Sequence, residues 1–192
     1  NKIEKENLKE STGLQDQIYA TYGGFSKITF TKENFKVSKI TNDAKTQKKI
    51  EENLILFYTY KSRVAHTIER KKFNNIKNKL RNLNEMKLMA HSAIKYIKEK
   101  DIDKIGLMLG KFWQHKKKLS TNVSNETIDK YYSTAIKNGA LGGKLIGAGG
   151  GGFLLIYAKK KYHEKIIKSL KKLTPVKFSF TNKGSEIIEN EI

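Results

Sequence analysis

The residues best suited to chemistry lie in one glycine-rich stretch, from Gly139 to Gly152, which is followed at once by an apolar run from Phe153 to Tyr157. The apolar run predicts a buried strand. Four consecutive glycines before such a strand lose much backbone entropy on folding, which positive φ angles or the close approach of a ligand would justify. Backbone amides presented in this way form a nest that suits phosphate oxygens. The stretch therefore predicts a phosphate-binding loop.

A glycine-rich hairpin without a ligand, joining a strand at 144–146 to the strand at 153–157, is the alternative interpretation of the same residues. Two familiar phosphate motifs do not fit. No Gly-Lys-Ser/Thr ends the stretch, as a Walker loop requires. The stretch also leads into a strand, whereas the glycines of a Rossmann turn open a helix.

Three stretches stand out, in this order along the chain: Thr12-Gly13-Leu14-Gln15-Asp16-Gln17 with Tyr22-Gly23-Gly24-Phe25, then Leu56-Phe57-Tyr58-Thr59 with Arg63 and Ala65, and Gly142 to Leu155. They resemble segments of the GHMP small-molecule kinases, in the form carried by the D-glycero-D-manno-heptose 7-phosphate kinases. The resemblance spans almost the whole chain, and the glycine stretch looks like the third, C-terminal motif of that family.

The resemblance implies a role for each candidate site residue. Asp16 would be the catalytic carboxylate, which accepts or orients the proton of the anomeric hydroxyl of a sugar. The alternative is that Asp16 only stabilises a helix N-terminus through the helix dipole and the free amides there. Arg63 would hold the substrate's own phosphate through a bidentate contact, or would form an ordinary surface ion pair. The remaining candidates would surround the substrate or the transferring phosphate: Lys144, Gly147, Ala148, Gly149, Gly150 and Gly151.

The implied reaction is transfer of the ATP γ-phosphate to the anomeric hydroxyl of heptose 7-phosphate, with ATP and Mg²⁺ as cofactors. Other sugar kinases of the family, of the galactokinase or fucokinase type, are alternatives. These kinases carry an ATP-phosphate loop of the kind Pro-x-x-x-Gly-Leu-Gly-Ser-Ser, which this sequence lacks. We therefore expect residues 1–52 to be the end of an N-terminal GHMP domain and residues 53–192 to be the C-terminal domain. We expect the Mg²⁺ ligands in the missing half, and a chain that is inactive alone.

The composition is also typical of a different class of protein, a basic module that binds nucleic acid or anionic surfaces. The 39 lysines and arginines outnumber the 19 acidic residues, for a net charge of +20. Only Arg63, Arg70 and Arg81 are arginines, although recognition of phosphate and base edges relies on the guanidinium group. The lysines are spread along the polar faces of the expected helices, which favours solvated surfaces over a nucleic-acid or membrane partner.

Cysteine is absent, so disulfides and thiolate metal sites are excluded. The four histidines show no i, i+4 pairing, so we expect no metal site. No apolar run approaches the ~20 residues that span a bilayer, and no signal-peptide pattern opens the chain. The sequence predicts a cytoplasmic protein that binds a sugar phosphate and ATP; association into a homo-oligomer stays open.

Strands, in which apolar and polar residues alternate, and helices, in which apolar residues recur every three or four positions, must position these residues. Residues 24–40 alternate as a hairpin that turns at 32–34, residues 42–52 form a polar connection with a helical turn, and 54–60 form a central strand. Apolar residues then recur at helical spacing from Leu80 to Ile97, after Asp101, and after Ser124 or Asn125. A basic helix from Tyr162 to Leu173 and a strand with Val176, Phe178 and Phe180 follow the glycine stretch.

This order from residue 54 predicts an α+β fold with a ferredoxin-like βαββαβ arrangement and extra helices, in which helices cover one face of a mostly antiparallel sheet. We expect three helix caps. Ser11 or Thr12 would cap the helix that carries Asp16, and Asp101 would cap a later helix. Ser124 or Asn125 would cap the helix that ends at Asn138-Gly139. Trp113 falls on an apolar stripe and is expected in the core, and His91 is expected in the core or at its boundary.

Overall fold

The computed structural model describes residues 13–41, 43–61, 79–147 and 149–189. Its helices are α1 (Gln15–Tyr22), α2 (Ala44–Glu52), α4 (Leu80–Lys98), α5 (Ile102–Lys117), α6 (Glu126–Lys137) and α7 (His163–Ser169). Its strands are β1 (Ser26–Phe30), β2 (Phe35–Lys39), β3 (Leu54–Tyr58), β4 (Ala140–Leu145), β5 (Phe153–Ala158) and β6 (Thr174–Val176). No helix in these ranges is both long enough and apolar enough to cross a membrane.

The larger sheet has the strand order β4-β5-β3-β6, and every neighbouring pair is antiparallel. Strand β3 lies between β5 and β6, which confirms the prediction that the apolar run from Leu54 forms a central strand. With helices between β3 and β4 and between β5 and β6, this is the ferredoxin-like βαββαβ arrangement, and the α+β prediction is confirmed. The glycine stretch connects β4 to β5 at one end of this sheet.

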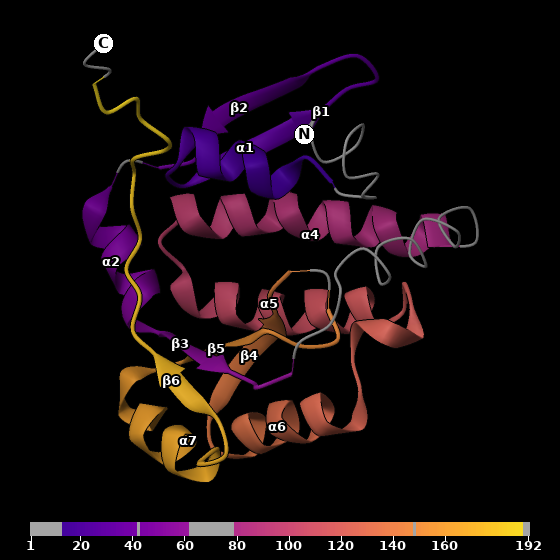
Figure 1. The fold of residues 1–192 in the computed structure, drawn as a ribbon, viewed down its shortest axis with the longest axis vertical. Helices are drawn as coiled ribbons and strands as arrows, with labels where there is room; N and C mark the ends of the chain where they lie inside the picture. The colour runs from indigo at the N-terminus through magenta and orange to yellow at the C-terminus, as the bar shows by residue number, and fades with distance from the viewer. Residues whose placement is uncertain (1–12, 42, 62–78, 148, 190–192) are drawn as a thin grey trace.

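Helices lie on both sides of the larger sheet, α5 on one and α6 and α7 on the other (Figure 1). The expectation of a sheet covered on one face was therefore wrong. Alternate residues of β5 explain the difference: Leu154 and Ile156 belong to one buried cluster and Tyr157 to another. Trp113 is fully buried, as predicted, whereas His91 is exposed.

Helix α5 lies unusually close to strand β4 because glycines meet at the contact. A Cβ atom added to Gly142 would lie 2.1 Å from the carbonyl oxygen of Gly106, and one added to Gly106 would lie 2.3 Å from the ring of Tyr157. Neither position has room for a side chain. This contact brings the end of α5 close to the glycine stretch.

The capping predictions were confirmed in part. Asn125 accepts a hydrogen bond from the Ile128 amide and caps α6, so the choice between Ser124 and Asn125 falls on Asn125. Asp101 precedes α5 but makes no side-chain cap; its carboxylate pairs with Lys104 at 2.6 Å instead. The polar segment expected to be a connection forms the whole of α2, which Asp43 caps through the Lys45 amide.

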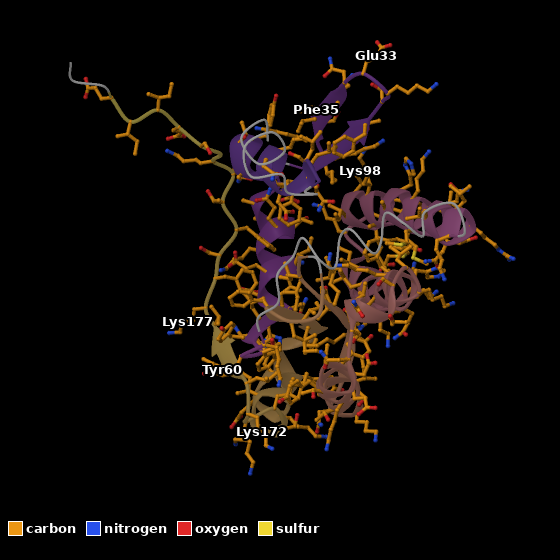
Figure 2. The ribbon with its side chains drawn as sticks, turned by 45° about the vertical axis from the view of Figure 1, so that its right-hand side comes forward. Glu33, Phe35, Tyr60, Lys98, Lys172 and Lys177 are labelled. Atoms are coloured by element: carbon orange, nitrogen blue, oxygen red, sulfur yellow. The ribbon has the colours of Figure 1, made fainter. Side chains whose placement is uncertain are left out.

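The hairpin of β1 and β2 was predicted correctly, with Phe30 opposite Phe35. Figure 2 shows its tip, with Glu33, projecting away from the rest of the protein. The apolar face of the hairpin is partly covered. Phe30 is half exposed, but Phe25 packs against Phe180, with ring centroids 4.8 Å apart.

The end of the chain differs from the prediction. Helix α7 is only His163–Ser169, and β6 stops at Val176. Residues 177–189 continue in extended form without strand pairing and run past α2 toward α1 (Figure 1). Direct bonds hold this tail: Gly24 donates to the Thr181 carbonyl and Ser185 to the Ala20 carbonyl. Phe178 and Phe180 therefore do not form the predicted final strand.

Several expectations lie outside the described residues. They concern Ser11 and Thr12 as the cap of α1, Arg63 and Ala65 of the second family-like stretch, and His66, one of the four histidines. Leu14 occupies the N-cap position of α1 without a side-chain hydrogen bond. The division at residue 52 falls between α2 and β3, and it remains our expectation.

Candidate active site

The segment 147–152 between β4 and β5, here called the glycine loop, has an unusual backbone. Gly147, Gly149, Gly150 and Gly152 all have positive φ angles, between 76° and 115°. L-residues other than glycine rarely adopt this region, because the Cβ atom crowds the backbone. The positive φ angles offered as a reason for so many glycines are therefore confirmed, and so is the hairpin that the loop closes.

Polar groups of three separate elements bind the carbonyl oxygens of the loop. The ammonium of Lys116, in the last turn of α5, donates to the Gly147 carbonyl at 2.5 Å. The amide group of Asn125 donates to the Gly150 carbonyl at 3.3 Å. The hydroxyl of Thr59, just after β3, donates to the Gly152 carbonyl at 2.7 Å, and the Thr59 amide donates to the same oxygen at 3.0 Å.

The amides of the loop divide into two sets. Gly150 donates to the Val123 carbonyl at 2.9 Å and Gly152 donates to the Lys61 carbonyl at 2.6 Å. The amides of Gly147, Gly149 and Gly151 have no acceptor among the described residues. Not every amide of the loop can belong to an anion-binding nest, because those of Gly150 and Gly152 are used inside the protein. The amides of Gly147, Gly149 and Gly151 are the ones left for an anion.

Neighbouring backbone also explains the glycines. A Cβ atom at Gly149 would lie 2.7 Å from the Val123 carbonyl oxygen, and one at Gly151 would lie 2.1 Å from the Lys61 carbonyl oxygen. Contacts this short require the backbone to move. By contrast, a Cβ atom at Gly147 meets nothing within 4 Å, so only its φ angle of 76° favours glycine there.

Lys144 is the second charged group of the site. Its side chain leaves strand β4 and places the ammonium 5.2 Å from the centre of the Phe112 ring on α5, a cation–π contact. Burial lowers the pKa of the Lys144 ammonium, and the charge of the Asp16 carboxylate opposes this shift. Asp16 and Lys144, which are far apart in the sequence, are thus within electrostatic range of each other.

Asp16 lies in the first turn of α1 with its side chain exposed. An acidic residue there interacts favourably with the helix dipole whatever its other role. The charge of Asp16 raises the pKa of the Lys144 ammonium, so the predicted carboxylate lies within electrostatic range of the predicted lysine. Arg63 and Ala148 were also predicted to be site residues, and both lie outside the described residues.

Other candidate sites are less convincing. A groove of 460 Å³ between α1 and the tail and a second of 460 Å³ between α6 and α7 are not lined by the glycine loop. Within the described ranges, no three His, Asp or Glu side chains are grouped to hold a metal ion. His115 and His163 bond instead to Asn82 and to the Ala158 carbonyl.

Two residues that bind the loop were missed by the sequence analysis. Lys116 belongs to a run of three lysines that looked like a solvated helix end, yet it is only 9% exposed. Asn125 was interpreted only as a helix cap. The apolar stripe of α5 carried one usable signal, because Lys116 follows the buried Trp113 at helical spacing.

The site belongs to a known domain. Residues 93–175 match the family model described as GHMP kinases C terminal. The matched segment includes β4, the glycine loop and β5, and its fold agrees with that of a solved relative. Residues 93–175 of the chain therefore form a domain of the GHMP kinase C-terminal family.

Three relatives extend this match. The chain is 34% identical, over 95% of its length, to a D-glycero-alpha-D-manno-heptose 7-phosphate kinase of Campylobacter jejuni. It is 31% identical to a solved protein of C. jejuni described as a sugar kinase, covering 95% of this chain and 53% of that one, with a TM-score of 0.66. It is 29% identical, over 77% of its length, to the bifunctional fucokinase/GDP-fucose pyrophosphorylase of Arabidopsis thaliana. The chain spans 55% of the first relative and 14% of the third.

Proposed function

We propose that the protein carrying this chain is an ATP-dependent kinase that phosphorylates the anomeric hydroxyl of D-glycero-D-manno-heptose 7-phosphate and forms the 1,7-bisphosphate. One observation carries the proposal: the 34% identity to a heptose 7-phosphate kinase extends over 95% of this chain. The glycine loop supports it, since the amides of Gly147, Gly149 and Gly151, which have no acceptor among the described residues, suit the oxygens of a phosphate group.

Asp16 is the proposed acid–base group. Phosphoryl transfer depends mainly on positioning and on neutralising the charge of the moving group. An exposed carboxylate at the start of α1 is open to a sugar hydroxyl and can orient or accept its proton. Lys144, held beside Phe112, supplies positive charge in the same region.

The remaining roles are assigned by position in the motifs. Arg63 is the proposed partner of the 7-phosphate, and Gly147, Ala148, Gly149, Gly150 and Gly151 form the proposed phosphate loop. ATP is the phosphoryl donor. Mg²⁺ would neutralise the phosphate charge, but the described residues offer no grouped ligand set for it. We place those ligands in the rest of the protein.

The test is an assay of the full-length protein with a panel of acceptors: heptose 7-phosphate, fucose, galactose and mevalonate. Heptose 7-phosphate is expected to give the highest kcat/KM. A preference for fucose would favour the resemblance to the fucokinase/GDP-fucose pyrophosphorylase of Arabidopsis thaliana and reject the heptose assignment. No ATP turnover with any acceptor would reject the kinase proposal for this protein.

A matched pair of variants tests the role of Asp16 in the same protein. Asp16→Asn is expected to lower kcat by about two orders of magnitude or more with little change in the KM for ATP, because a positioned acid–base group is lost. Asp103→Asn, on a surface of α5 where Asp103 pairs with Lys159, is the control. Equal kcat for Asp16→Asn and the control would leave Asp16 as a helix-terminal residue only.

A further inference from the structure

Lys116 is an unusual residue for the end of a helix. Lysines in the last turn normally stay in solvent, where their positive charge interacts favourably with the negative end of the helix dipole. Its neighbours behave in this way: Lys118 is exposed, and Lys117 pairs with Asp129 at 3.0 Å. Lys116 is instead 9% exposed and donates to the Gly147 carbonyl. Burial of an ammonium is unfavourable unless its hydrogen bonds are made inside the protein. The bond to the Gly147 carbonyl is such a bond, and it connects α5 to the glycine loop.

Asn125 holds the loop from the other side while it caps α6. Its side-chain oxygen accepts from the Ile128 amide at 3.0 Å and its NH₂ group donates to the Gly150 carbonyl at 3.3 Å. Both ends of one side chain are used, which fixes the direction of the Gly150 carbonyl. In a trans peptide the C=O and the following N–H point in opposite directions. The Gly151 amide is therefore turned away from Asn125.

We propose that Lys116 and Asn125 are positioning residues of the glycine loop, which bind the carbonyl oxygens of Gly147 and Gly150 and so keep the Gly151 amide available to a phosphate group. The two residues come from α5 and from the start of α6, and they hold the loop at two points three residues apart. Neither has to touch the substrate. The proposal rests on the proposed kinase function for the identity of the anion, but not for the positioning itself.

Neutral variants of the full-length protein separate positioning from capping. Asn125→Ser retains a good helix cap, since serine and asparagine are similarly favourable at this position, but it removes the donor to Gly150. Lys116→Met retains the length and the apolar stem but loses the ammonium, and Lys116→Arg restores a charged donor. Lys118→Met and Asn34→Ser are matched controls on an exposed helix end and in the hairpin turn.

The first measurement is hydrogen–deuterium exchange without any ligand. The Gly150 and Gly152 amides are bonded to carbonyls of Val123 and Lys61, so they report on loop order. Each neutral variant is expected to speed exchange in the loop peptide about fivefold, since a hydrogen bond from a side chain to a carbonyl contributes on the order of 1 kcal/mol and 1.4 kcal/mol corresponds to tenfold. Exchange in β3 should stay as in the wild type.

The second measurement is the affinity for inorganic phosphate, by calorimetry. Asn125→Ser and Lys116→Met should weaken it several-fold, with recovery in Lys116→Arg and no change in either control. Wild-type loop exchange in both neutral variants would overturn the proposal. So would loop exchange that rises only in proportion to exchange in β3, because that describes general destabilisation.

The two ideas fail separately. If the wild-type protein turns over ATP but the neutral variants bind phosphate normally despite a loosened loop, the positioning proposal is wrong and the kinase proposal stands. If the wild-type protein transfers no phosphate and binds none, the kinase proposal fails. The exchange measurement still decides in that case whether the two side chains order the loop.

Discussion

The hydroxyl of Thr59 donates a hydrogen bond of 2.7 Å to the carbonyl oxygen of Gly152. This contact joins the end of the central strand β3 to the end of the glycine loop, across 93 positions of sequence. Both residues belong to stretches that resemble family motifs, and the contact gives a physical reason for one of them. Threonine after β3 fixes the point at which the loop enters β5.

Thr59→Val should therefore lower the free energy of unfolding by about 1 kcal/mol, because a buried hydroxyl is replaced by a methyl group while the Thr59 amide still serves the Gly152 carbonyl. Urea denaturation measures this. Thr29→Val, at an exposed position of β1, is the control and should change stability little. Equal stability of Thr59→Val and wild type would show that the hydroxyl bond contributes nothing.

Two alanine substitutions in the glycine loop should differ in cost. Gly149→Ala combines a φ of 115° with a Cβ contact of 2.7 Å to the Val123 carbonyl, so we expect a loss of about 3 kcal/mol or more. Gly147→Ala has only its φ of 76°, so a loss of about 1–2 kcal/mol is expected. Denaturation of both variants tests this order, and the reverse order would contradict the loop geometry.

The pKa of Lys144 should respond to a change at Asp16. The Asp16 carboxylate opposes the burial that lowers this pKa, so Asp16→Asn should lower the Lys144 pKa further. NMR titration of the labelled Lys144 side chain measures it directly. Asp43→Asn removes a carboxylate that pairs elsewhere, with Lys100, and is the control. An unchanged Lys144 pKa in Asp16→Asn would separate the two residues that we place in one site.

Stability at acid pH should depend on Asp43. Hydrogen bonds from Lys100 and Thr46 lower its pKa from 3.8 to about 2. Because the folded-state pKa is depressed, Asp43 stabilises the protein above pH 3.8, and this contribution is lost as the pH falls toward 2. Asp43→Asn should therefore be less stable than wild type at pH 6, and the difference should shrink near pH 2. A difference that is constant across this range would show that ionisation of Asp43 does not matter.

The positive charge should not make this protein a nucleic-acid binder. Several lysines are paired with carboxylates, for example Lys104 with Asp101 and Lys159 with Asp103, and Lys172 and Lys177 lie at the outer edge of the protein (Figure 2). We expect no tight binding to duplex DNA or RNA in a gel-shift assay at about 0.15 M salt. Nanomolar affinity that falls steeply with salt, as counterion release requires, would contradict this and favour the basic-module alternative.

Local patterns determined most of the elements. The apolar repeats of α4, α5 and α6, the alternation of β1 and β2 and the apolar run of β3 are set by residues close in sequence, so they could be predicted. The predictions failed where local signals were weak. The polar segment of α2 forms a helix because Asp43 caps it and Ile50 is buried. Phe178 and Phe180 alternate like a strand, but no neighbouring strand pairs with them.

The local sequence predicts a glycine-rich turn between two strands, and the positive φ angles found there are the backbone that glycine tolerates best. The packing of distant elements sets which groups of the loop serve the fold and which remain for a ligand. Val123 and Lys61 take the amides of Gly150 and Gly152, while Lys116 and Asn125 bind the loop carbonyls. These partners lie far from the loop in sequence, and their hydrogen bonds depend on how α5, α6 and β3 pack. A local pattern can indicate that Lys116 is buried, but it does not identify the carbonyl that Lys116 binds.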